Sequence, residues 1–364
     1  LAKATLDSIA TDPADLSAKI DRARSFRWAG AIPTAEAVNG IFPLPAHPER
    51  VNVVAADGSQ IYPDRHGLAL YYLINIGSIV FRHGTAEAPL CSSEPDIFFD
   101  EADLYENDAL ISGVKINAQR DVQELGELAR LAAEEAVAAP TVTLLDNGLL
   151  LFFSLQEQER KAKDEAIRNY LAQLDQLKAS GAAVAGVVDR PRAANVVRLL
   201  HLATLGAEEI DQEHLRGTGV FQHFTDAAIF HSLRPGERSA LFVNASPDNL
   251  DYYQPRGHTV YFFYLNAGRP GKDSLLRIEV PEWVAKDRAR LDLVHAAVAE
   301  QCRFSDGFPY VLMRAHELAV VAMDERRAFD ELVMGALVRR GLTPGVSQKA
   351  QGKAWTGSGK RRYP

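Results

Sequence analysis

Two short apolar stretches of this sequence each end in an aspartate, and they are its most informative chemical feature. Val53-Val-Ala-Ala-Asp57 and Val142-Thr-Leu-Leu-Asp146 both have the composition of buried β-strands. Because neighbouring strands end at the same edge of a sheet, the two carboxylates can meet there. Hard cations such as Mg²⁺ and Mn²⁺ prefer oxygen ligands, and a pair of them can activate water against a phosphodiester. The pattern predicts a metal site that contains Asp57 and Asp146.

A simpler explanation exists for each aspartate. An Asp before Gly commonly forms a turn or caps a helix, and an isolated strand-Asp-Gly sequence is more often that than a metal ligand. Gly58 allows a sharp turn, and Ser59 could cap it or contact a phosphate. The presence of two such aspartates in one chain strengthens the metal-ligand interpretation, but the turn interpretation stays ahead of it. The local pattern alone therefore makes the metal site a hypothesis.

The elements that must position these residues alternate between strands and helices. The first strand and the apolar run after it predict an opening β-meander, and the Pro-rich residues 33–48 predict a loop. Periodicity and turn residues predict these elements: helices at 12–30, 114–139, 154–180, 193–205 and 310–340, and strands at 51–57, 67–81, 141–146, 183–188, 239–244, 258–266 and 274–280. We expect an α/β protein with a mixed β-sheet flanked by helices.

Composition excludes several classes of protein. With 47% hydrophobic and 24% charged residues, the 364-residue chain is typical of a globular protein. The formal net charge of −8 argues against a protein that only coats nucleic acid, but not against a nuclease that concentrates metal-binding carboxylates. Cys91 and Cys302 suggest neither a disulfide framework nor a zinc site. No membrane-spanning run or signal peptide is evident, so we expect a cytoplasmic protein. Because the sequence starts at Leu1 and not at Met, we expect that its native N-terminus is missing or processed.

Further acidic and histidine side chains have two interpretations each. The acidic residues at 94–108 are typical of a solvated loop or helix face rather than of a metal cage. On the helix at 114–139, Glu124 follows Arg120 by four residues, but Glu127 lies nearly one turn later and could be the inward carboxylate. His316 could hydrogen-bond within the core, or bind metal and carry a proton.

The order of these features resembles the NurA nuclease family. Asp57-Gly58-Ser59 is similar to the first family motif, Arg120-x-x-x-Glu124 to the second and Leu144-Leu-Asp146 to the third. Pro309 to Ala315-His316 is similar to the last motif. The resemblance runs from about residue 50 to about residue 335. It includes three further stretches: Gly186-Val-Val, Pro235-Gly-Glu-Arg-Ser239 and Arg277-Ile-Glu-Val-Pro281.

This resemblance implies an RNase H-like core with family-specific helical and β insertions. It implies Asp57, Glu124, Asp146 and His316 as catalytic and metal-binding residues, with Mn²⁺ or Mg²⁺, two ions per site. The implied activity is cleavage of single- and double-stranded DNA, with 5′ to 3′ exonuclease and possible single-strand endonuclease activity in end resection. The implied partners are a second copy of the chain, as a homodimer, and a HerA-type hexameric ATPase.

The domain boundaries follow from the same reading. We expect an N-terminal helix and loop at 1–48, a NurA nuclease domain at 49–342 and a basic, disordered tail at 343–364. The tail carries Lys349, Lys353, Lys360, Arg361 and Arg362, which could bind DNA or the motor, or could simply add solubility.

Three positions depart from the family pattern. Asn147-Gly148 stands where the family has Gly-Ser, Phe308 replaces a tyrosine before the proline, and Asp189-Arg190-Pro191-Arg192 occupies a place that favours lysine. Arg190 or Arg192 could substitute for that lysine at a phosphate. The predicted DNA contacts are Ser59, Arg120, Arg190, Arg192 and Tyr310, with Arg238 as a further candidate; each arginine could equally be a surface ion-pair partner.

Three functions compete at this point. The first is a metal-dependent DNA nuclease acting in double-strand break repair. The second is a catalytically weakened, dimeric NurA-like adaptor for a DNA translocase, which the departures at Asn147 and Phe308 suggest. The third is an RNase H-like enzyme that acts on RNA or on an RNA–DNA hybrid. Retention of all three carboxylates favours the first.

Overall fold

The computed structural model describes residues 2–9, 13–65, 69–106, 108–151 and 160–339. Its strands are β1 (Ala31–Pro33), β2 (Ile41–Phe42), β3 (Val51–Ile61), β4 (Tyr72–His83), β5 (Leu90–Phe98), β6 (Tyr105–Glu106), β7 (Ala109–Leu110), β8 (Thr141–Asp146), β9 (Ala183–Asp189), β10 (Arg238–Ser239), β11 (Phe242–Asn244), β12 (Val260–Asn266) and β13 (Leu275–Pro281). Its α-helices are α1 (Ala2–Ile9), α2 (Pro13–Arg24), α3 (Glu101–Leu104), α4 (Gly113–Glu135), α5 (Arg160–Ser180), α6 (Asn195–Thr204), α7 (Gln212–Arg216), α8 (Asp226–Phe230), α9 (Glu282–Ala285), α10 (Arg288–Arg303), α11 (Tyr310–Ala319) and α12 (Met323–Arg339). The shorter helical turns are η2 (Ala207–Glu209), η3 (Gly219–Phe221), η4 (Asn249–Tyr253) and η5 (Gln254–Arg256).

A five-stranded core forms one side of the main sheet, with β5 at its edge. The strands β3, β4 and β5 form an antiparallel meander, β8 lies parallel beside β3, and β9 lies parallel beyond β8. In space the order is β5-β4-β3-β8-β9, which is 3-2-1-4-5 in chain order. This arrangement is that of an RNase H-like core, so the predicted mixed sheet and core are confirmed.

Antiparallel strands extend the sheet beyond β9. The order continues through β13, β12 and β11 to β1, while β10 pairs with both β12 and β2. The residues of β1 and β2 lie in or next to the Pro-rich stretch that was expected to be a loop. They form short strands because β11 and β10 offer them unpaired backbone groups, a tertiary opportunity that local sequence does not encode.

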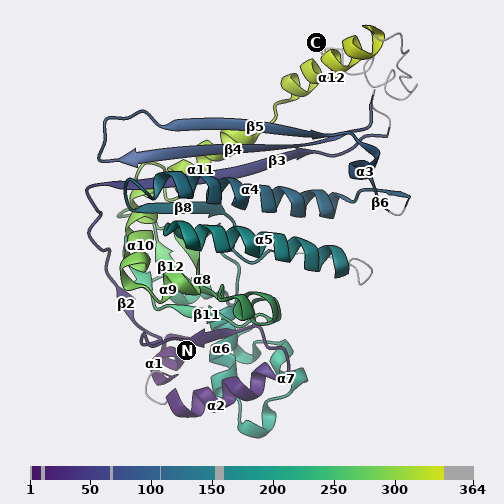
Figure 1. The fold of residues 1–364 in the computed structure, drawn as a ribbon. Coiled ribbons are helices and arrows are strands. Elements are labelled where there is room, and N and C mark those ends of the chain that lie inside the picture. The colour runs from purple at the N-terminus through teal and green to yellow at the C-terminus, as the bar shows by residue number, and fades with distance from the viewer. Residues whose placement is uncertain (1, 10–12, 66–68, 107, 152–159, 340–364) are drawn as a thin grey trace, which may run out of the picture.

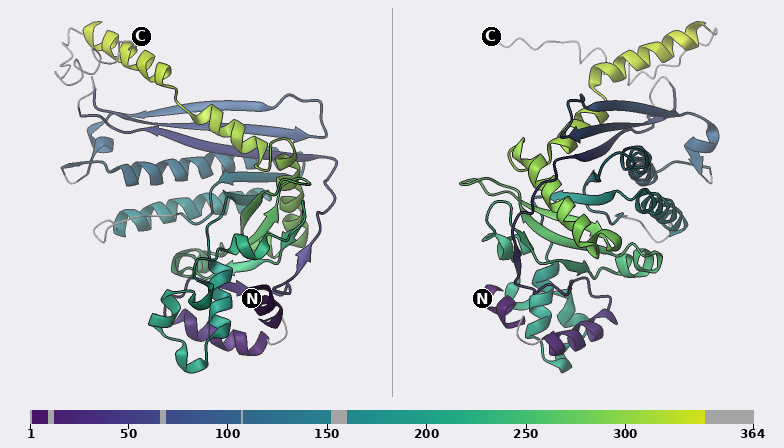
Figure 2. Two further views of the ribbon diagram at one scale, coloured as in Figure 1. Left: turned by 180° about the vertical axis from the view of Figure 1, so that it is seen from behind. Right: turned by 60° about the vertical axis from the view of Figure 1, so that its left-hand side comes forward.

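Helices cover both faces of the core (Figures 1 and 2). On one face, α4 and α5 pack Leu128 and Leu174 into the same buried cluster as Val54 of β3. On the other face, α10 and α11 pack their apolar side chains into a second cluster that contains Val53. Successive residues of a strand point to opposite faces, so β3 has to be apolar at consecutive positions.

A third buried cluster lies at the end of the molecule that carries the N-terminal helices (Figure 1). There α1, α2, α6 and α8 pack against one another and against the faces of β1, β11 and β12. At the opposite end α12 projects from the body of the protein. Residues 340–364, which include the predicted basic tail and Gly341, lie outside the described residues.

The strand that carries Asp57 is longer than expected. It was predicted to end at Asp57, but β3 continues to Ile61 because β4 pairs with it along its whole length. Its parallel neighbour β8 pairs only with residues from Asn52 to Ala56. Asp57 is therefore the first residue of β3 beyond β8, which still places its carboxylate at a sheet edge.

The predicted helix at 310–340 is two helices. The first, α11, ends at Ala319, and Val320 has φ −60° and ψ 125°, which is not helical. The carbonyl of Ala319 accepts hydrogen bonds from Ser59 Oγ at 2.6 Å and Asn75 Nδ2 at 2.7 Å. Strand side chains thus take the place of the next helical N–H, and two β-branched residues follow, which favour the break.

The acidic residues at 94–108 are only partly loop and helix. Glu94 and Asp96 lie on β5, an edge strand of the described sheet, and both are exposed. Charges on an edge strand disfavour pairing with another sheet.

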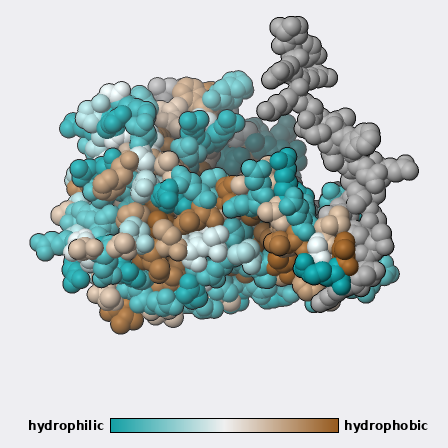
Figure 3. All heavy atoms as spheres, turned by 90° about the horizontal axis from the view of Figure 1, so that it is seen from above, coloured by the Kyte–Doolittle hydropathy of each residue, from teal (hydrophilic) through white to brown (hydrophobic). Residues whose placement is uncertain are grey.

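Hydrophilic residues cover most of the face in Figure 3, with apolar residues in separate patches. Among the described helices, none combines the length and apolar character needed to cross a membrane.

Candidate active site

Asp57 and His316 contact each other across the sheet edge. The His316 Nδ1 atom lies 2.7 Å from Asp57 Oδ2. The register explains the contact, because Asp57 lies opposite Gly77 of β4. A Cβ at Gly77 would come within 2.3 Å of the Ala319 nitrogen and 2.6 Å of the Ala315 carbonyl oxygen. The missing side chain therefore lets the backbone of α11 pack directly on β4, which brings His316 to Asp57.

Glu124 approaches the same edge from α4. This helix begins after Ser112, whose hydroxyl accepts a hydrogen bond from the Lys115 N–H. Glu124 is 6% exposed, and a Cβ at Gly58 would lie 2.6 Å from its Oε1 atom. Gly58 lies within β3 rather than in the predicted turn, and its missing side chain makes room for the glutamate.

The charge of Glu124 is only partly compensated. Its Oε1 lies 3.0 Å from Arg120 Nε, which favours the ionised carboxylate. Burial nevertheless raises the pKa of Glu124 well above its usual value, and the nearby carboxylates of Asp121, Asp57 and Asp146 raise it further. The alternative, Glu127, instead accepts hydrogen bonds from Ser78 Oγ and Arg130. Glu124 is the one that lies among the other acids.

Asp146 ends β8 at the position predicted for it. Burial raises the pKa of Asp146 to about 6, and Asp57 and Asp189 raise it as well, while His316 lowers it. The influence of these neighbours shows that the four side chains share one electrostatic environment. Asp57 and His316 are in contact, and Glu124 and Asp146 line one cavity, so the four predicted residues lie in one region of the sheet edge.

Two acidic neighbours were not among the predicted site residues. Asp189 is the last residue of β9, so it follows the same strand-end pattern as Asp57 and Asp146 and could have been found by it. Asp121 precedes Glu124 by three residues on the same side of α4, and burial raises its pKa. Asp121, Glu124 and Asp146 line one cavity of about 280 Å³, together with Arg120.

The donor set fits a hard divalent cation by its chemistry. Three carboxylates from different elements gather where burial and mutual repulsion penalise their negative charge, and a cation would relieve that penalty. In the arrangement described, no three His, Cys, Asp or Glu side chains lie close enough to hold one ion. Glu124 is paired with Arg120, and Asp57 with His316.

The predicted DNA contacts are distributed unevenly. Arg120 belongs to the site itself, where it also donates to Gln60 Oε1 at 2.9 Å. Arg190 follows Asp189 directly, its side chain is 93% exposed, and it lines a second groove of about 570 Å³ with Lys272. Arg192 is exposed nearby. The Ser59 hydroxyl donates to the carbonyl that ends α11.

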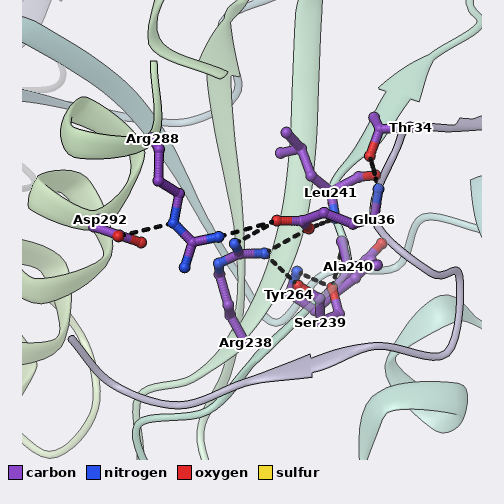
Figure 4. Close-up of polar contacts among 9 residues, drawn as sticks. All are labelled: Thr34, Glu36, Arg238, Ser239, Ala240, Leu241, Tyr264, Arg288 and Asp292. Atoms are coloured by element: carbon purple, nitrogen blue, oxygen red, sulfur yellow. Dashed lines mark hydrogen bonds and ion pairs between the residues drawn. The ribbon is translucent and has the colours of Figure 1, made fainter. Parts of the chain in front are cut away.

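Tyr310 and Arg238 lie away from the acidic residues. The Tyr310 ring packs edge-on against Phe81, whose register partner is Val53, four residues before Asp57. Arg238 is fully buried and forms an ion pair with Glu36 at 2.7 Å (Figure 4). The prediction of Arg238 as a phosphate contact is therefore wrong, because the neighbouring carboxylate and the chain around it exclude a ligand.

Several known proteins are similar to this chain over much of its length. The family model described as the NurA domain matches residues 51–321. The NurA nuclease from Sulfolobus solfataricus is 16% identical, with 92% of this chain and 94% of that chain covered and a TM-score of 0.47. A NurA structure with manganese is 11% identical, with coverage of 92% and 95% and a TM-score of 0.43. The catalytic domain of human endonuclease V is 15% identical, with coverage of 88% and 97% and a TM-score of 0.35. No curated protein matches the chain.

Proposed function

The chain belongs to the NurA domain family, and we propose that it is a divalent-metal-dependent deoxyribonuclease. The observation that carries the proposal is that Asp57 of β3 contacts His316 of α11 at the sheet edge where Glu124 of α4 and Asp146 of β8 line one cavity. Asp57, Glu124 and Asp146 would hold Mn²⁺ or Mg²⁺, with two ions per site, and His316 would complete the set.

The chain's own residues prepare this site in distinct ways. When bound, a divalent cation supplies Lewis acidity and a water of lowered pKa. Asp57 and Asp146 offer oxygens from adjacent strands, and Arg120 favours the ionised form of Glu124 until a cation takes over that task. Because Glu124 is buried, its carboxylate oxygens have little contact with water and keep a fixed orientation.

His316 is positioned to move a proton. With Asp57 ionised, the 2.7 Å contact makes Nδ1 the protonated nitrogen, which donates to Asp57 Oδ2. The Nε2 atom is then the proton acceptor in the neutral ring. The side chain is 64% exposed, so this nitrogen can reach a substrate phosphate or its attacking water. We propose proton transfer at Nε2 as its role; metal ligation, the other predicted role, would use the same lone pair and is the alternative.

Exposed arginines beside the strand ends suit the DNA backbone. Arg190 and Arg192 follow the last residue of β9, and Arg190 lines the groove that also contains Lys272. Guanidinium groups bind phosphate oxygens in a fixed, bidentate geometry. We propose these two arginines as phosphate contacts. Contacts from Arg120, Ser59 and Tyr310 stay predictions, since these side chains are engaged within the protein.

The finer functional assignments rest on family membership. We propose 5′ to 3′ exonuclease activity on single- and double-stranded DNA ends, with single-strand endonuclease activity, in double-strand break resection. We further propose a cytoplasmic homodimer that works with a HerA-type hexameric ATPase. Residues 49–342 would form the nuclease unit, after an N-terminal part at 1–48 and before a tail at 343–364.

Degradation of end-labelled DNA tests the activity. The full chain is incubated with 5′- or 3′-labelled linear duplex and single-stranded DNA in Mn²⁺, Mg²⁺ or chelator. We expect shortening only with metal, and release of the 5′ label first. Asp57→Ala should abolish it. Cleavage in chelator, or by Asp57→Ala at the rate of wild type, would overturn the proposal.

The two competing functions are outcomes of the same experiment. An adaptor would bind no Mn²⁺ in calorimetry and leave every labelled DNA intact. An enzyme specific for RNA or hybrids would cleave those substrates and spare DNA under one metal and salt condition. Size-exclusion chromatography and co-purification with a HerA-type ATPase test the proposed assembly.

A further inference from the structure

The turn that follows Asp146 lies on a buried glutamate of β13. The register places Glu279 opposite Gly186 of β9, which is itself opposite Leu145. Its Oε2 atom accepts a hydrogen bond from the Leu149 N–H at 2.9 Å. Glu279 is 5% exposed, so this bond is shielded from water. Glu279, which is not one of the predicted metal ligands, thus holds the backbone three residues after one of them.

Two glycines make this approach possible. A Cβ at Gly148 would lie 2.6 Å from Glu279 Oε2, and a Cβ at Gly186 would lie 2.5 Å from the Asn147 carbonyl oxygen. The turn therefore crosses β9 at a residue without a side chain and closes over the carboxylate. Asn147 has φ +114°, a conformation that costs free energy in any residue except glycine. Something has to hold the turn in that conformation.

The charge of Glu279 is neutralised by Arg277. The Nε and Nη2 atoms of this arginine both lie 2.8 Å from Glu279 Oε1. Its Nη1 atom donates to Asn195 Oδ1 at 2.8 Å, and the guanidinium lies 3.7 Å from the centre of the Phe262 ring. Each carboxylate oxygen of Glu279 therefore has its own partner: Oε1 binds the arginine and Oε2 binds the turn.

The same cluster reaches the helices at the N-terminal end. Asp226 accepts hydrogen bonds from the first N–H groups of α6, at Val196 and Val197, and from the Tyr264 hydroxyl. That hydroxyl lies 3.4 Å from Arg277 Nη1. The position of Arg277 is thus set from two sides, by β12 and by α6, and Arg277 in turn fixes Glu279.

We propose that Glu279 is a positioning residue for Asp146, and that Arg277 holds Glu279 in place. The inference rests on the proposed function, because positioning matters only if Asp146 binds metal. By accepting the Leu149 N–H, Glu279 fixes the turn in its costly conformation, and the turn fixes the direction of the Asp146 carboxylate. This positioning role also explains why Arg277-Ile-Glu-Val-Pro281, which contributes no aspartate to the sheet edge, belongs to the stretches that resemble the family.

Glu279→Gln separates positioning from packing. Glutamine has the same shape but a single oxygen, for which Arg277 and the Leu149 N–H then compete. The charged donor forms the stronger bond, so the turn should lose its acceptor. We expect faster hydrogen exchange at Leu149, and Mn²⁺ affinity by calorimetry and kcat each lowered by ~10–100-fold, as for other residues that orient metal ligands. The KM for DNA should stay unchanged.

A second substitution should reverse the first. In Arg277→Met/Glu279→Gln the competitor is gone, so the glutamine oxygen can accept the Leu149 N–H again. Replacement of a buried ion pair by neutral groups of similar volume is often tolerated. We expect slow exchange at Leu149 and recovery of most of the lost Mn²⁺ affinity. If Glu279 served stability alone, the double variant would regain its melting temperature, because neither charge is left unpaired, without slow exchange at Leu149.

Glu36→Gln is the matched control. Glu36 also pairs with a buried arginine, Arg238, and also accepts a backbone N–H, that of Leu241 at 2.8 Å. It does so between the segment after β1 and the residues of β10 and its neighbour Leu241 (Figure 4). Glu36→Gln should lower the melting temperature at least as much as Glu279→Gln, yet leave Mn²⁺ affinity and kcat unchanged.

Three results would overturn the inference. One is Glu279→Gln with wild-type exchange at Leu149 and wild-type Mn²⁺ affinity. The second is an equal loss of kcat in Glu36→Gln, which would indicate general destabilisation. The third is a double variant that recovers nothing. Failure of the proposed function is distinguishable, since wild type itself would then neither bind Mn²⁺ nor cleave DNA, while exchange at Leu149 would still report on the turn.

Discussion

Two glutamates of this protein, Glu279 buried and Glu36 half-buried, each bind a buried arginine and a backbone N–H in different regions. Glu279 binds Arg277 and the Leu149 N–H, and Glu36 binds Arg238 and the Leu241 N–H. Both arginines lie over a phenylalanine ring, 3.7 Å from the centre of Phe262 and 4.1 Å from that of Phe42.

The surroundings of the two pairs differ. Glu36 joins the segment between β1 and β2 to β10 and β11, and its side chain is 18% exposed and also faces Arg288 (Figure 4). The side chain of Glu279 is 7% exposed and contacts the turn after Asp146. The same kind of pair thus anchors a peripheral segment in one region and the turn after Asp146, a proposed metal ligand, in the other. Its location relative to the acidic residues, not its chemistry, decides what it does.

The largest effect should come from Asp146→Asn, which tests whether the region near Glu279 serves function at the expense of stability. Loss of a direct metal ligand should lower kcat by ~10³-fold or more. In chelator the variant should be more stable than wild type. The folded-state pKa of Asp146 is about 6 against a usual 3.8, so its ionisation costs stability as pH rises from 3.8 to 6, and the cost is complete above 6.

Denaturant unfolding with and without metal measures this difference in stability between Asp146→Asn and wild type. After allowance for the partial exposure of Asp146, we expect a gain of roughly 1–2 kcal/mol at pH 8 and none near pH 3.5. With Mn²⁺ the order should reverse, because only wild type gains binding free energy. An Asp146→Asn variant that is less stable than wild type in chelator would show that the aspartate is structural.

Glu36→Ala should break the other side of the comparison. Removal of one partner of a buried pair leaves Arg238 uncompensated, at a cost of about 3–5 kcal/mol in unfolding free energy. The folded fraction should keep its kcat, measured at a temperature well below the transition. If the loss of unfolding free energy comes from the uncompensated Arg238 charge, Glu36→Ala/Arg238→Met should regain part of it, because no charge is then left unpaired in the interior.

Acid should weaken the region near Arg238 selectively. His295 donates to the Gly236 carbonyl at 2.8 Å, and burial lowers its pKa to about 4, with the nearby Arg238 charge lowering it further. The pKa of His295 in the folded protein lies below 6.5, its usual value. The contribution of neutral His295 to the free energy of unfolding is therefore complete above pH 6.5 and is lost as the pH falls toward 4. The loss should be about 3 kcal/mol at most.

Unfolding between pH 7 and 4 in wild type and His295→Gln tests that expectation. The variant should be less stable at pH 7, yet its unfolding free energy should fall less steeply over this range. Parallel pH curves for the two proteins would mean that other groups, and not His295, cause the acid sensitivity.

The smallest effect should come from Ser59→Ala near the acidic residues. The lost hydrogen bond to the Ala319 carbonyl should cost about 1 kcal/mol, because Asn75 still satisfies that oxygen. We expect no change in DNA affinity beyond that. A large fall in affinity with unchanged stability would instead restore Ser59 to the DNA contacts predicted from the sequence.

Much of the fold was readable from local patterns. Thr141–Asp146 was predicted to the residue, and the strand at 183–188 nearly so, because consecutive β-branched and apolar residues between a proline or glycine and an aspartate have few other solutions. The core topology followed from family resemblance. By contrast, α10 has no counterpart among the predicted elements, since its buried His295, Gln301 and Cys302 obscure the apolar period.

What the sequence determined by itself was the chemistry available at the strand ends. Asp57 and Asp146 are recognisable because strand patterning and side-chain type are local properties. Tertiary structure alone decided which other groups meet them. Gly77 admits α11 and His316 to Asp57, and Gly58 admits Glu124. Tertiary structure also paired Arg238 with Glu36, about two hundred residues away in the chain, whereas Arg277 and Glu279 are neighbours on one face of β13.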